Sequence, residues 1–541
     1  MRGLVQYRPL LLSGFLDHAA ETYPKVPIVS WSGNLLFRYT YADAAARARR
    51  LASSLQRRGF GPGDFIGSLA WTTHRHFELM YAAPGIGVVL HTANPRLSPE
   101  HLSYTLNHSE ARLLFVDPEC LAQVEELAPQ LRKVESYVVM GDRSDVPTTR
   151  LPNVLFYEDL LTEGDETFAW PDIDERSGST LCFTSGTTGD PKGVLYSHRG
   201  TYLSTLAIAA ANVWAISESD TIIVVAPFFH CNGWGAPYLG PMAGAKLVLP
   251  GRALDARSLQ RLIVAEGATV GPAVPTVWHA IAEYCQLAGE RLGKLNRIIC
   301  GGAAPPLALM RTYWREFGIR TVQVWGMTET THAASVLWTD EDVLSGRAEP
   351  RTPQGRPVFG TEIRIVDDEG GTLPHDGKTV GHLQVRGHSC ATGYLRRPDV
   401  EVLDRDGWLK TGDIAAIEAG SGLRITDRLK DVIKSGGEWI SSIDLENAAS
   451  SHPAVDEAAV IGVPHPHWQE RPVMFVVLRT GHELSAEVLR AHLAPTVAKW
   501  WLPDEVLFVD ALPHYATGKV RKDVLRTQYA ASASAKKVPS T

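Results

Sequence analysis

Short apolar runs alternate with amphipathic helical stretches from about residue 41 to residue 324, and this alternation constrains the fold most strongly. Residues 41–60 place Ala and Leu on one helical stripe and Arg on the other face. The turn signal Gly61–Asp64 follows, and residues 65–70 then have the character of a buried strand. Such alternation is typical of α/β units with mostly parallel sheets. Further strands are predicted at Leu113–Val116, Ser136–Val139, Thr221–Ala226, Lys246–Leu249, Arg297–Cys300 and Val322–Val324, with helices at Ser258–Glu266 and Thr276–Leu287.

The character of the sequence changes near residue 355. Residues 355–426 contain short β patterns with turn signals, which indicate a small antiparallel or barrel-like subdomain. After Asp427 an α+β pattern begins, and the tail 530–541 is small and polar and is expected to fray. We therefore expect a large N-terminal domain (1–426), a junction at 427–431 and a small C-terminal domain (432–541). The elements predicted in the small domain are Ile443–Ser451, Val455–Val463, Pro472–Arg479 and Ala486–Leu493.

Composition excludes several classes of protein. The chain has 541 residues, of which 44% are hydrophobic and 21% charged, so it can bury large cores and is not disordered. Its formal charge of −7 comes without a basic block, which argues against a general nucleic-acid binder. The six cysteines show no CxxC spacing, and the most apolar long segment, residues 222–229, is far below the roughly 20 residues of a membrane helix. We expect a cytoplasmic protein with reduced thiols, whether enzyme, binding protein or scaffold.

Thr184-Ser-Gly-Thr-Thr-Gly-Asp-Pro-Lys-Gly193 is the most informative segment. It follows an apolar strand pattern and holds four hydroxyl residues, three glycines and a lysine in ten positions. Glycines let backbone N–H groups turn toward an anion, and hydroxyls and Lys192 supply further donors, so the segment suits a triphosphate. Its lysine spacing differs from that of a Walker A loop. A polar surface loop is the alternative interpretation, and the combination of residues makes it the weaker one.

This segment resembles the phosphate loop of the adenylate-forming (AMP-binding) superfamily, which includes acyl-CoA synthetases, luciferases and nonribosomal-peptide adenylation domains. Other motifs of the family follow in the family's order over nearly the whole chain. The resemblance implies an α/β fold with a mobile α+β C-terminal lid, and the use of ATP, Mg²⁺ and coenzyme A. The residues it assigns to the phosphates of ATP are Thr184, Ser185, Gly186, Thr187, Thr188, Gly189 and Lys192.

Trp325-Gly-Met-Thr-Glu-Thr330 resembles the family's aromatic-G-x-T-E motif. The resemblance implies that the aromatic ring stacks on adenine, Thr328 touches phosphate, and Glu329 binds Mg²⁺ with Thr184 nearby. A carboxylate is a suitable ligand, because Mg²⁺ usually takes one or two carboxylates plus phosphate oxygens. Gly301-Gly-Ala-Ala-Pro305 resembles the loop beside adenine. The nucleotide-binding residues implied in these two segments are Gly302, Ala303, Ala304, Trp325, Gly326, Met327 and Thr328.

The last part of the chain resembles the remaining nucleotide and hinge motifs of the family. Asp413, in a Thr-Gly-Asp tripeptide, and Arg428 match the ribose contacts, with Ile425 between them. A carboxylate can accept hydrogen bonds from two ribose hydroxyls. The resemblance places the domain pivot at Lys430 and the lysine that enters the site during adenylation at Lys519. The thiol side is assigned to Lys434, Ser435, Gly436, Gly437, Glu438 and Trp439.

Pro227-Phe-Phe-His-Cys-Asn-Gly-Trp234 resembles the segment that lines the acyl pocket of fatty acyl-CoA synthetases. The resemblance assigns His230, Trp234 and Gly301 to this pocket and also brings His230 toward the carboxylate or the α-phosphate. Ordinary core packing is the alternative for these aromatic residues. Residues 90–97 and 464–472 also match the fatty acyl branch, so a medium- or long-chain acid is favoured.

The implied reaction has two halves: a carboxylic acid and ATP give acyl-AMP and pyrophosphate, and the thiol of CoA then gives acyl-CoA and AMP. The resemblance assigns catalysis to Lys519, Glu329, Thr184 and His230, and it implies no metal other than Mg²⁺. One alternative is a natural-product enzyme that activates an aryl acid or uses an acceptor other than CoA, including diazotisation-type chemistry. Another is a relative that binds nucleotide without catalysis. No nucleic-acid partner is expected, and a homodimer is carried over from similar long-chain ligases.

Overall fold

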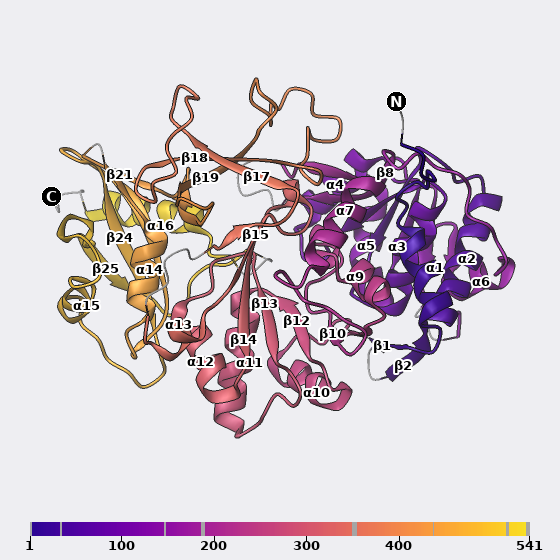
Figure 1. Ribbon diagram of the computed structural model, residues 1–541, viewed down its shortest axis with the longest axis horizontal. Helices are drawn as coiled ribbons and strands as arrows, with labels where there is room; N and C mark the ends of the chain where they lie inside the picture. The colour runs from indigo at the N-terminus through magenta and orange to yellow at the C-terminus, as the bar shows by residue number, and fades with distance from the viewer. Residues whose placement is uncertain are drawn as a thin grey trace.

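Two large sheets with helices on their faces make up most of the chain, and two smaller sheets follow (Figure 1). The structure is a computed structural model that describes residues 3–32, 35–144, 148–184, 190–348, 354–436, 438–515 and 519–536. The predicted α/β class, with a small α+β region at the C-terminus, is confirmed. Among the described residues, no helix is long and apolar enough to span a membrane.

The first large sheet has seven strands, in the order β7-β6-β5-β3-β4-β8-β9. Neighbours are parallel except β8 and β9, so β3, β4, β5 and β8 end at one edge of the sheet. The strands are β3 (Phe65–Leu69), β4 (Val89–Ala93), β5 (Leu113–Val116), β6 (Ser136–Val139), β7 (Val154–Phe156), β8 (Gly178–Phe183) and β9 (Gly193–Ser197). This edge therefore places Asn94, which follows β4, near Thr184, which follows β8.

The second large sheet has nine strands, in the order β16-β15-β14-β13-β12-β10-β11-β1-β2. Its centre, from β14 to β1, is parallel, whereas β2, β15 and β16 are antiparallel. The strands are β1 (Pro27–Ser32), β2 (Leu35–Thr40), β10 (Thr221–Ile223), β11 (Lys246–Leu249), β12 (Val270–Ala273), β13 (Arg297–Cys300), β14 (Arg320–Trp325), β15 (Ser335–Trp338) and β16 (Arg356–Pro357). The predicted strand 221–226 is shorter than expected, because the amide of Val225 donates to the carbonyl of Ile223 and forms a turn.

One hydrophobic core joins the two large sheets. It contains residues from both sheets, such as Leu90 and Leu247, and from the helices between them. A second core lies under α10, α11 and α12 on the other face of the nine-stranded sheet. The helices of this region are α1 (Ser13–Thr22), α2 (Tyr41–Arg57), α3 (His74–Gly85), α4 (Pro99–Ser109), α5 (Leu121–Leu127), α6 (Tyr157–Glu163), α7 (His198–Ala209), α8 (Cys231–Trp234), α9 (Ala236–Ala243), α10 (Ala256–Glu266), α11 (Pro275–Ala288), α12 (Leu307–Phe317) and α13 (Glu341–Ser345).

A four-stranded antiparallel sheet lies between the large sheets and the C-terminus, in the order β17-β18-β19-β20. Its strands are β17 (Thr361–Val366), β18 (Val380–Gly387), β19 (Leu409–Ile417) and β20 (Leu423–Arg428). The register of β19 and β20 pairs Asp413 directly with Arg428. The predicted β subdomain is therefore present, and its register brings together two of the predicted ribose contacts.

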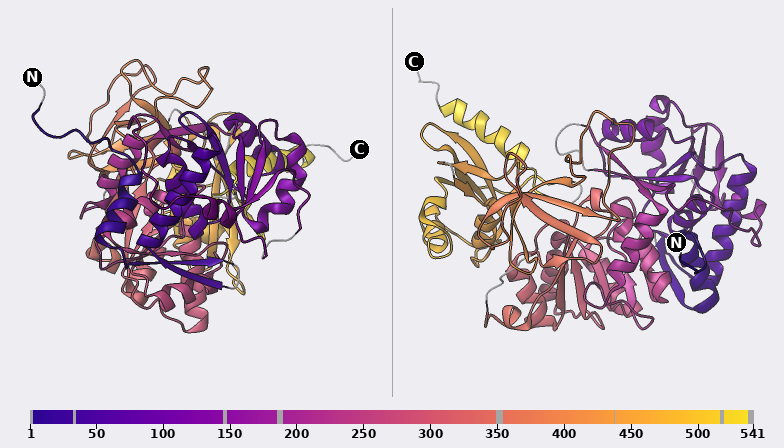
Figure 2. Two further views of the ribbon diagram at one scale, coloured as in Figure 1. Left: turned by 90° about the vertical axis from the view of Figure 1, so that its right-hand side faces the viewer. Right: turned by 45° about the horizontal axis from the view of Figure 1, so that its top comes forward.

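The C-terminal lobe, residues 433–536, packs its own helices on a mixed sheet (Figure 2). Its elements are β21 (Ile433–Ser435), β22 (Glu438–Ile440), α14 (Ser442–Ser450), β23 (Val455–His465), β24 (Gln469–Leu478), α15 (Ala486–Leu493), β25 (Glu505–Phe508) and α16 (Lys522–Lys536). The expectation of a frayed tail from residue 530 is wrong as far as residue 536, because α16 continues to Lys536. Alanine is the best helix former, and the Ala-rich sequence therefore extends the helix.

Candidate active site

Asp413 lies between two donors from different strands. The indole Nε1 of Trp325, at the end of β14, donates to Oδ2 of Asp413 at 3.0 Å. Nε of Arg428 lies 2.8 Å from the other oxygen, Oδ1. Only 2% of the Asp413 side chain is exposed, and a carboxylate so buried needs such partners. Three residues that the sequence assigned to one nucleoside therefore form one cluster.

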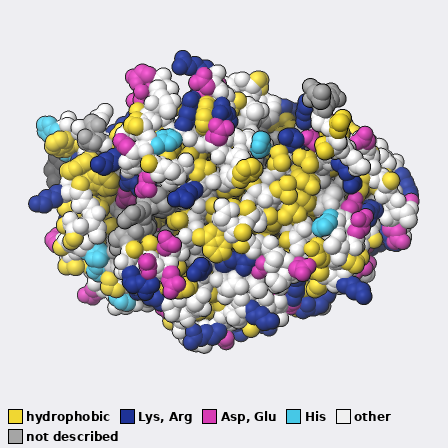
Figure 3. Space-filling model, viewed as in Figure 1, with side chains coloured by type: hydrophobic (Ala, Val, Ile, Leu, Met, Phe, Trp, Pro, Cys, Tyr) yellow, Lys and Arg dark blue, Asp and Glu magenta, His cyan; other side chains and the backbone are white. Residues whose placement is uncertain are grey.

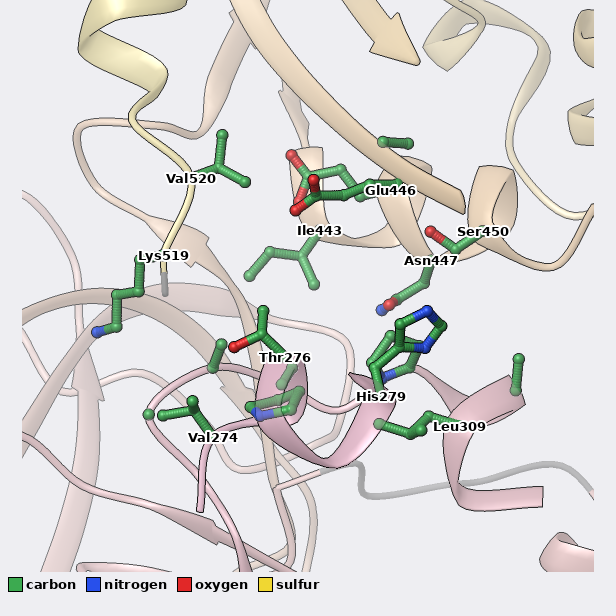
Figure 4. Close-up of a pocket in the computed structure, with 18 of the residues that line it drawn as sticks. Val274, Thr276, His279, Leu309, Ile443, Glu446, Asn447, Ser450, Lys519 and Val520 are labelled. Atoms are coloured by element: carbon green, nitrogen blue, oxygen red, sulfur yellow. The ribbon is translucent and has the colours of Figure 1, made fainter. Parts of the chain in front are cut away.

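This cluster lines a cavity of about 590 Å³ between the nine-stranded sheet and the C-terminal lobe. Figure 4 shows Lys519 on the segment of the lobe that leads into α16, near Thr276 in the first turn of α11 and Val274 just before that helix. The predicted nucleotide residues that line this cavity are Gly302, Ala303, Ala304, Trp325, Gly326, Asp413, Ile425 and Arg428. Residues 302–304 are small and lie in the loop that follows β13.

Lys519 is held in this cavity by a short hairpin of the lobe. The amide of Tyr515 donates to the carbonyl of Lys519 at 2.7 Å, and His514 pairs with Val520 as an isolated bridge. Burial, and then the positive charge of Arg428, lower the pKa of Lys519 to about 8. The amine is therefore mostly protonated at neutral pH, and it presents a positive charge beside the nucleoside cluster.

A second cavity, of about 290 Å³, lies at the shared carboxyl edge of the seven-stranded sheet. Thr184 and His230 line it together with Arg96 and Arg521, and His514 of the lobe lines both cavities. Burial, then the charges of Arg96 and Lys519, lower the pKa of His230 to about 4. His230 is therefore a neutral imidazole at neutral pH, able to donate or accept a hydrogen bond but not to add charge.

Thr184 and Lys192 close the base of the predicted phosphate loop. The amide of Thr184 donates to the carbonyl of Lys192 at 2.9 Å, and the amide of Lys192 donates to Oγ1 of Thr184 at 3.1 Å. Residues 185–189, which carry Ser185, Gly186, Thr187, Thr188 and Gly189, lie outside the described residues.

Glu329 is buried beside the base of this loop. It lies in a short 3₁₀ turn (Thr328–Thr330), and the hydroxyl of Tyr394 donates to its Oε1 at 2.5 Å. The Nζ atom of Lys192 lies 5.3 Å from the centroid of the Tyr394 ring. Tyr394 connects the carboxylate to the loop, and the sequence analysis missed it because it belongs to no motif and lies 65 residues from Glu329.

The backbone around Glu329 is fixed by short contacts. The amide of Met327 donates to Oγ1 of Thr330 at 2.9 Å, and the carbonyl of Thr328 accepts from the hydroxyl of Tyr196 at 2.6 Å. Oγ1 of Thr328 lies 3.8 Å from Sγ of Cys231, next to His230. Met327 and Thr328 therefore lie between the phosphate-loop side and the predicted acyl side, although neither lines the larger cavity.

The donor set fits a magnesium ion that is shared with a nucleotide. Within the described ranges, no group of three or more His, Cys, Asp or Glu side chains is arranged to hold a metal on its own. Glu329 offers one buried carboxylate and Thr184 one hydroxyl, and Mg²⁺ typically takes its remaining oxygens from substrate phosphates and water. Glu329 and Thr184 therefore suit a Mg²⁺ ion that nucleotide phosphates also bind, because two side chains are too few to hold a metal alone.

Trp234 lies in a left-handed turn of the predicted acyl segment, which includes the short element α8. Five consecutive residues have positive φ: Cys231 (36°), Asn232 (41°), Gly233 (62°), Trp234 (55°) and Gly235 (83°). A left-handed conformation costs a non-glycine residue roughly 1–2 kcal/mol, so the turn needs support.

Buried hydrogen bonds of Asn232 supply that support. Its Oδ1 accepts from the hydroxyl of Thr180 at 2.5 Å, and its Nδ2 donates to Oγ1 of Thr92 at 3.3 Å. The turn places the indole of Trp234 against the loop that begins at Gly301, since a methyl group added at Gly301 would lie 3.4 Å from Cη2 of Trp234. Trp234 and Gly301 are thus neighbours, and Asn232, to which the quoted motif gave no role, holds the turn.

The predicted thiol segment lies away from both cavities. Lys434 and Ser435 belong to β21 and Trp439 to β22, and the Trp439 ring lies 6.2 Å from that of His382 on β18. Gly436 lies against the indole of Trp468. Neither cavity is lined by Lys434, Ser435, Gly436 or Trp439, while Gly437 and the side chain of Glu438 lie outside the described residues. The structure therefore does not bring this segment together with Lys519.

Lys430 precedes the first strand of the lobe. Its carbonyl accepts from Nη2 of Arg526 at 3.1 Å, and burial lowers the pKa of its amine.

On the face in Figure 3, Lys and Arg side chains are interspersed with Asp and Glu. Basic side chains also line both cavities, among them Arg428 and Lys519 in the larger one and Arg96 and Arg521 in the smaller one.

Comparison with known proteins gives consistent matches. The sequence model of the AMP-binding enzyme family matches residues 16–395, and that of the AMP-binding enzyme C-terminal domain matches residues 444–519. The 3-methylmercaptopropionyl-CoA ligase of Ruegeria lacuscaerulensis is 44% identical over 534 residues, which cover 98% of this chain and 99% of the relative. The medium-chain-fatty-acid–CoA ligase of Ectopseudomonas oleovorans is 40% identical over 539 residues, 98% of each chain.

A solved structure agrees with these matches. The crystal structure of an anthranilate CoA ligase in complex with anthranoyl-AMP superposes with a TM-score of 0.87 at 25% identity, over 98% of this chain and 99% of the other. The first family match alone spans more than half of the chain. The chain therefore belongs to the AMP-binding enzyme family of the adenylate-forming superfamily.

Proposed function

We propose that this chain is an ATP-dependent carboxylate–CoA ligase. In the first half-reaction a carboxylate oxygen attacks the α-phosphorus of ATP, the bond to the β-phosphate oxygen breaks, and pyrophosphate leaves. In the second, the sulfur of CoA attacks the acyl carbon, the thiol proton is lost, and AMP leaves with the electrons of the anhydride bond. One observation carries the proposal: Lys519, from the C-terminal lobe, lies in the same cavity as Trp325, Asp413 and Arg428.

The chain's own residues then have distinct tasks in the first half-reaction. Asp413 and Arg428 bind the ribose, Trp325 covers the base, and the loop from Thr184 to Lys192 binds the phosphates. The protonated amine of Lys519 stabilises the negative charge that develops where the two anions meet. Neutral His230 orients the carboxylate by a hydrogen bond. Glu329 and Thr184 would hold Mg²⁺, which supplies charge neutralisation at the phosphates.

We propose further that the lobe alternates between two positions. The large domain (1–426) and the lid (432–541) are joined by the junction 427–431, with Lys430 as the pivot, and a few residues suffice to absorb such a rotation. Support comes from the separation of the two functional segments: Lys519 lines the nucleotide cavity, whereas the thiol segment from Lys434 to Trp439 lies against β18. Rotation would exchange them, so that CoA reaches the acyl-adenylate after Lys519 has withdrawn.

A medium- or long-chain apolar acid is the proposed substrate. The 40%-identical relative named above is a medium-chain-fatty-acid–CoA ligase, and the acyl segment of this chain is bounded by Trp234, Gly301 and His230. The alternative, an aryl acid or an acceptor other than CoA, is supported by the shared fold of an anthranilate CoA ligase. We also propose a cytoplasmic location, because all six cysteines are free, and a homodimer as in similar ligases.

A panel of acids tests both the reaction and the substrate. Purified protein is supplied with ATP, Mg²⁺ and straight-chain acids from acetate to palmitate, plus benzoate and anthranilate, and pyrophosphate release is measured with and without CoA. We expect release that depends on the acid, fastest with medium-chain acids, and acyl-CoA only when CoA is present. Acid-dependent product without CoA would favour the alternative, and no release with any acid would refute the ligase.

A further inference from the structure

Lys522 is buried at the point where three parts of the chain meet. It is the first residue of α16, and its Nζ lies 2.6 Å from Oε1 of Glu446 on α14. The same Nζ donates to Oγ of Ser442 at 2.5 Å. Glu446 also accepts from the amide of Val460 on β23 at 2.8 Å. Lys522 therefore ties the start of α16 to the centre of the lobe.

The third part is the end of β20, where the junction 427–431 begins. Oδ2 of Asp427 accepts from the amide of Ser442 at 2.7 Å, and its Oδ1 accepts from the amide of Arg428 at 2.7 Å. Burial raises the pKa of Asp427, and the charge of Lys522 opposes that rise most strongly. Asp427 and Lys522 both line the nucleotide cavity. The positive charge of Lys522 thus offsets two negative charges, that of Glu446 in the lobe and that of Asp427 at the end of β20.

The position of Lys522 is transmitted to Lys519 through a very short segment. Only two residues separate them, a reach of about 10 Å even when fully extended. Beyond Lys519, the amide of Arg521 donates to the carbonyl of Pro513 at 2.7 Å, which closes the hairpin. Asp523 adds a second tie, because the hydroxyl of Tyr515 donates to its Oδ1 at 2.9 Å. A shift of Lys522 would therefore move Lys519 by a similar amount.

We propose that Lys522 is a positioning residue for the adenylation half-reaction: its charge, shared between Glu446 of the lobe and Asp427 at the end of β20, holds the hairpin so that Lys519 lies in the nucleotide cavity. The inference rests on the proposed function. Lys522 does not contact the substrate in this role. Its effect is confined to the arrangement in which Asp427 faces α14.

Electrostatics explains why this network depends on the position of the lobe. A buried carboxylate that loses its cation is strongly destabilising, so Asp427, Glu446 and Lys522 stabilise one another only together. Lys522 and Glu446 both belong to the lobe and stay paired when it moves. Asp427 lies at the end of β20, at the start of the junction, so its attraction to Lys522 acts while β20 faces α14 and favours the arrangement with Lys519 in the cavity. That arrangement is required for the first half-reaction and not for the second.

The test compares the two half-reactions in Lys522→Met. Adenylation is followed by ATP–pyrophosphate exchange with octanoate, and thiolysis by formation of octanoyl-CoA from supplied octanoyl-AMP and CoA. We expect exchange to fall about 100-fold, since a misplacement of about 1 Å at a catalytic group has effects of this size, while thiolysis changes little. Lys522→Arg, which keeps the charge, should restore most of the exchange.

Two further variants separate positioning from stability. Lys522→Met/Glu446→Met replaces the ion pair with apolar residues of similar volume and should recover thermal stability, yet exchange should stay low because Asp427 still lacks its cation. Arg490→Gln is the matched control in the lobe: Arg490 donates to the carbonyls of Pro503 and Asp504 at 2.9 Å and 2.7 Å, away from the hairpin. Its variant should lower both half-reactions in parallel with stability.

The outcomes distinguish the inference from the proposed function. If the unmodified protein shows no exchange with any acid of the panel, the ligase itself is refuted. If the unmodified protein exchanges but Lys522→Met lowers exchange and thiolysis by the same factor, the positioning role is overturned. Recovery of exchange in the double Met variant would also overturn it, because the apolar pair cannot compensate Asp427.

Discussion

Trp325 donates its indole N–H to Asp413, so the residue expected to cover the base also orients the carboxylate expected to bind the ribose. Arg428 holds the second oxygen of the same carboxylate at 2.8 Å. The proposed base and sugar contacts therefore form one unit, so a substitution of Trp325 should also weaken the binding of the ribose.

Trp325→Phe keeps a flat aromatic face but removes the donor to Asp413. A hydrogen bond to a charged group contributes about 1.5–3 kcal/mol, so we expect the KM for ATP to rise by about 10-fold or more with kcat little changed. Steady-state kinetics with varied ATP measure this split. Trp338→Phe is the matched control, because Trp338 donates its indole N–H to the carbonyl of Val213 at 2.8 Å, on β15. An unchanged KM in Trp325→Phe would contradict the coupling.

The pH dependence of adenylation should report the amine of Lys519. Its pKa is about 8, and the protonated form is the active one, so exchange should fall as the pH rises through about 8. Lys519→Arg keeps its charge to about pH 12, so its residual exchange should lose this alkaline limb. The measurement is a pH profile of ATP–pyrophosphate exchange, with thiolysis of supplied acyl-adenylate as the comparison. The same alkaline limb in Lys519→Arg would assign it to another group.

Tyr394→Phe should weaken the response to magnesium. The hydroxyl of Tyr394 orients Glu329 at 2.5 Å, and removing a group that orients a metal ligand typically costs about 10–100-fold in metal affinity. We expect the Mg²⁺ concentration for half-maximal exchange to rise at saturating ATP. Tyr202→Phe, whose ring stacks on Phe15 with centroids 4.4 Å apart, is the control and should leave it unchanged. An equal response in both variants would remove Tyr394 from the metal site.

Asp117→Asn should stabilise the protein at alkaline pH. Burial raises the pKa of Asp117 to about 7, and its Oδ2 accepts from the amide of Trp71 at 2.7 Å, a bond that Asn can keep. Below its unfolded pKa of about 4 the carboxyl is protonated in both states and costs nothing. As the pH rises toward the folded pKa, stability falls, and the cost stays at higher pH.

Thermal unfolding measures this effect at two pH values. The unfolding temperature of Asp117→Asn should exceed that of the unmodified protein at about pH 8, where about 1.4 kcal/mol per pKa unit is at stake, and should match it at about pH 4. Asp142→Asn is the control, because hydrogen bonds from Ser144 lower rather than raise its pKa. A lower unfolding temperature for Asp117→Asn at about pH 8 would contradict this prediction, because it would show that the charged carboxylate stabilises the protein.

The sequence predicts the large-scale architecture well because its strands are short, apolar and separated by strong turn signals. The strands Leu113–Val116 and Arg297–Cys300 have the predicted ends, since each is completely buried between helical layers. The end of β10 differs, because a turn at Val225 is set by contacts beyond the strand itself. Helix α16 was underestimated because small residues resemble a loose tail, although alanine favours a helix.

The motifs predict which residues meet at the nucleotide cavity, and tertiary contacts decide the rest. Asp413 and Arg428 belong to recognisable motifs, and they are paired with each other on the neighbouring strands β19 and β20. Tyr394 and Lys522 belong to no quoted motif, and Asn232 lies in one without an assigned role. Each acts through side chains that are distant in the sequence, such as Glu329, Glu446 and Thr180, and no local pattern identifies such partners.

The left-handed turn from Cys231 to Gly235 limits which substitutions in the predicted acyl segment could change the preferred acid. Positive φ is a severe penalty for β-branched residues, so Val, Ile and Thr are excluded at positions 231, 232 and 234. Asn232 is further constrained by its bonds to Thr180 and Thr92. Gly301 is constrained as well, because an added Cβ would lie 2.6 Å from Cγ2 and 2.9 Å from the carbonyl oxygen of Val324, so a change on this side of the proposed acyl pocket requires more than one substitution.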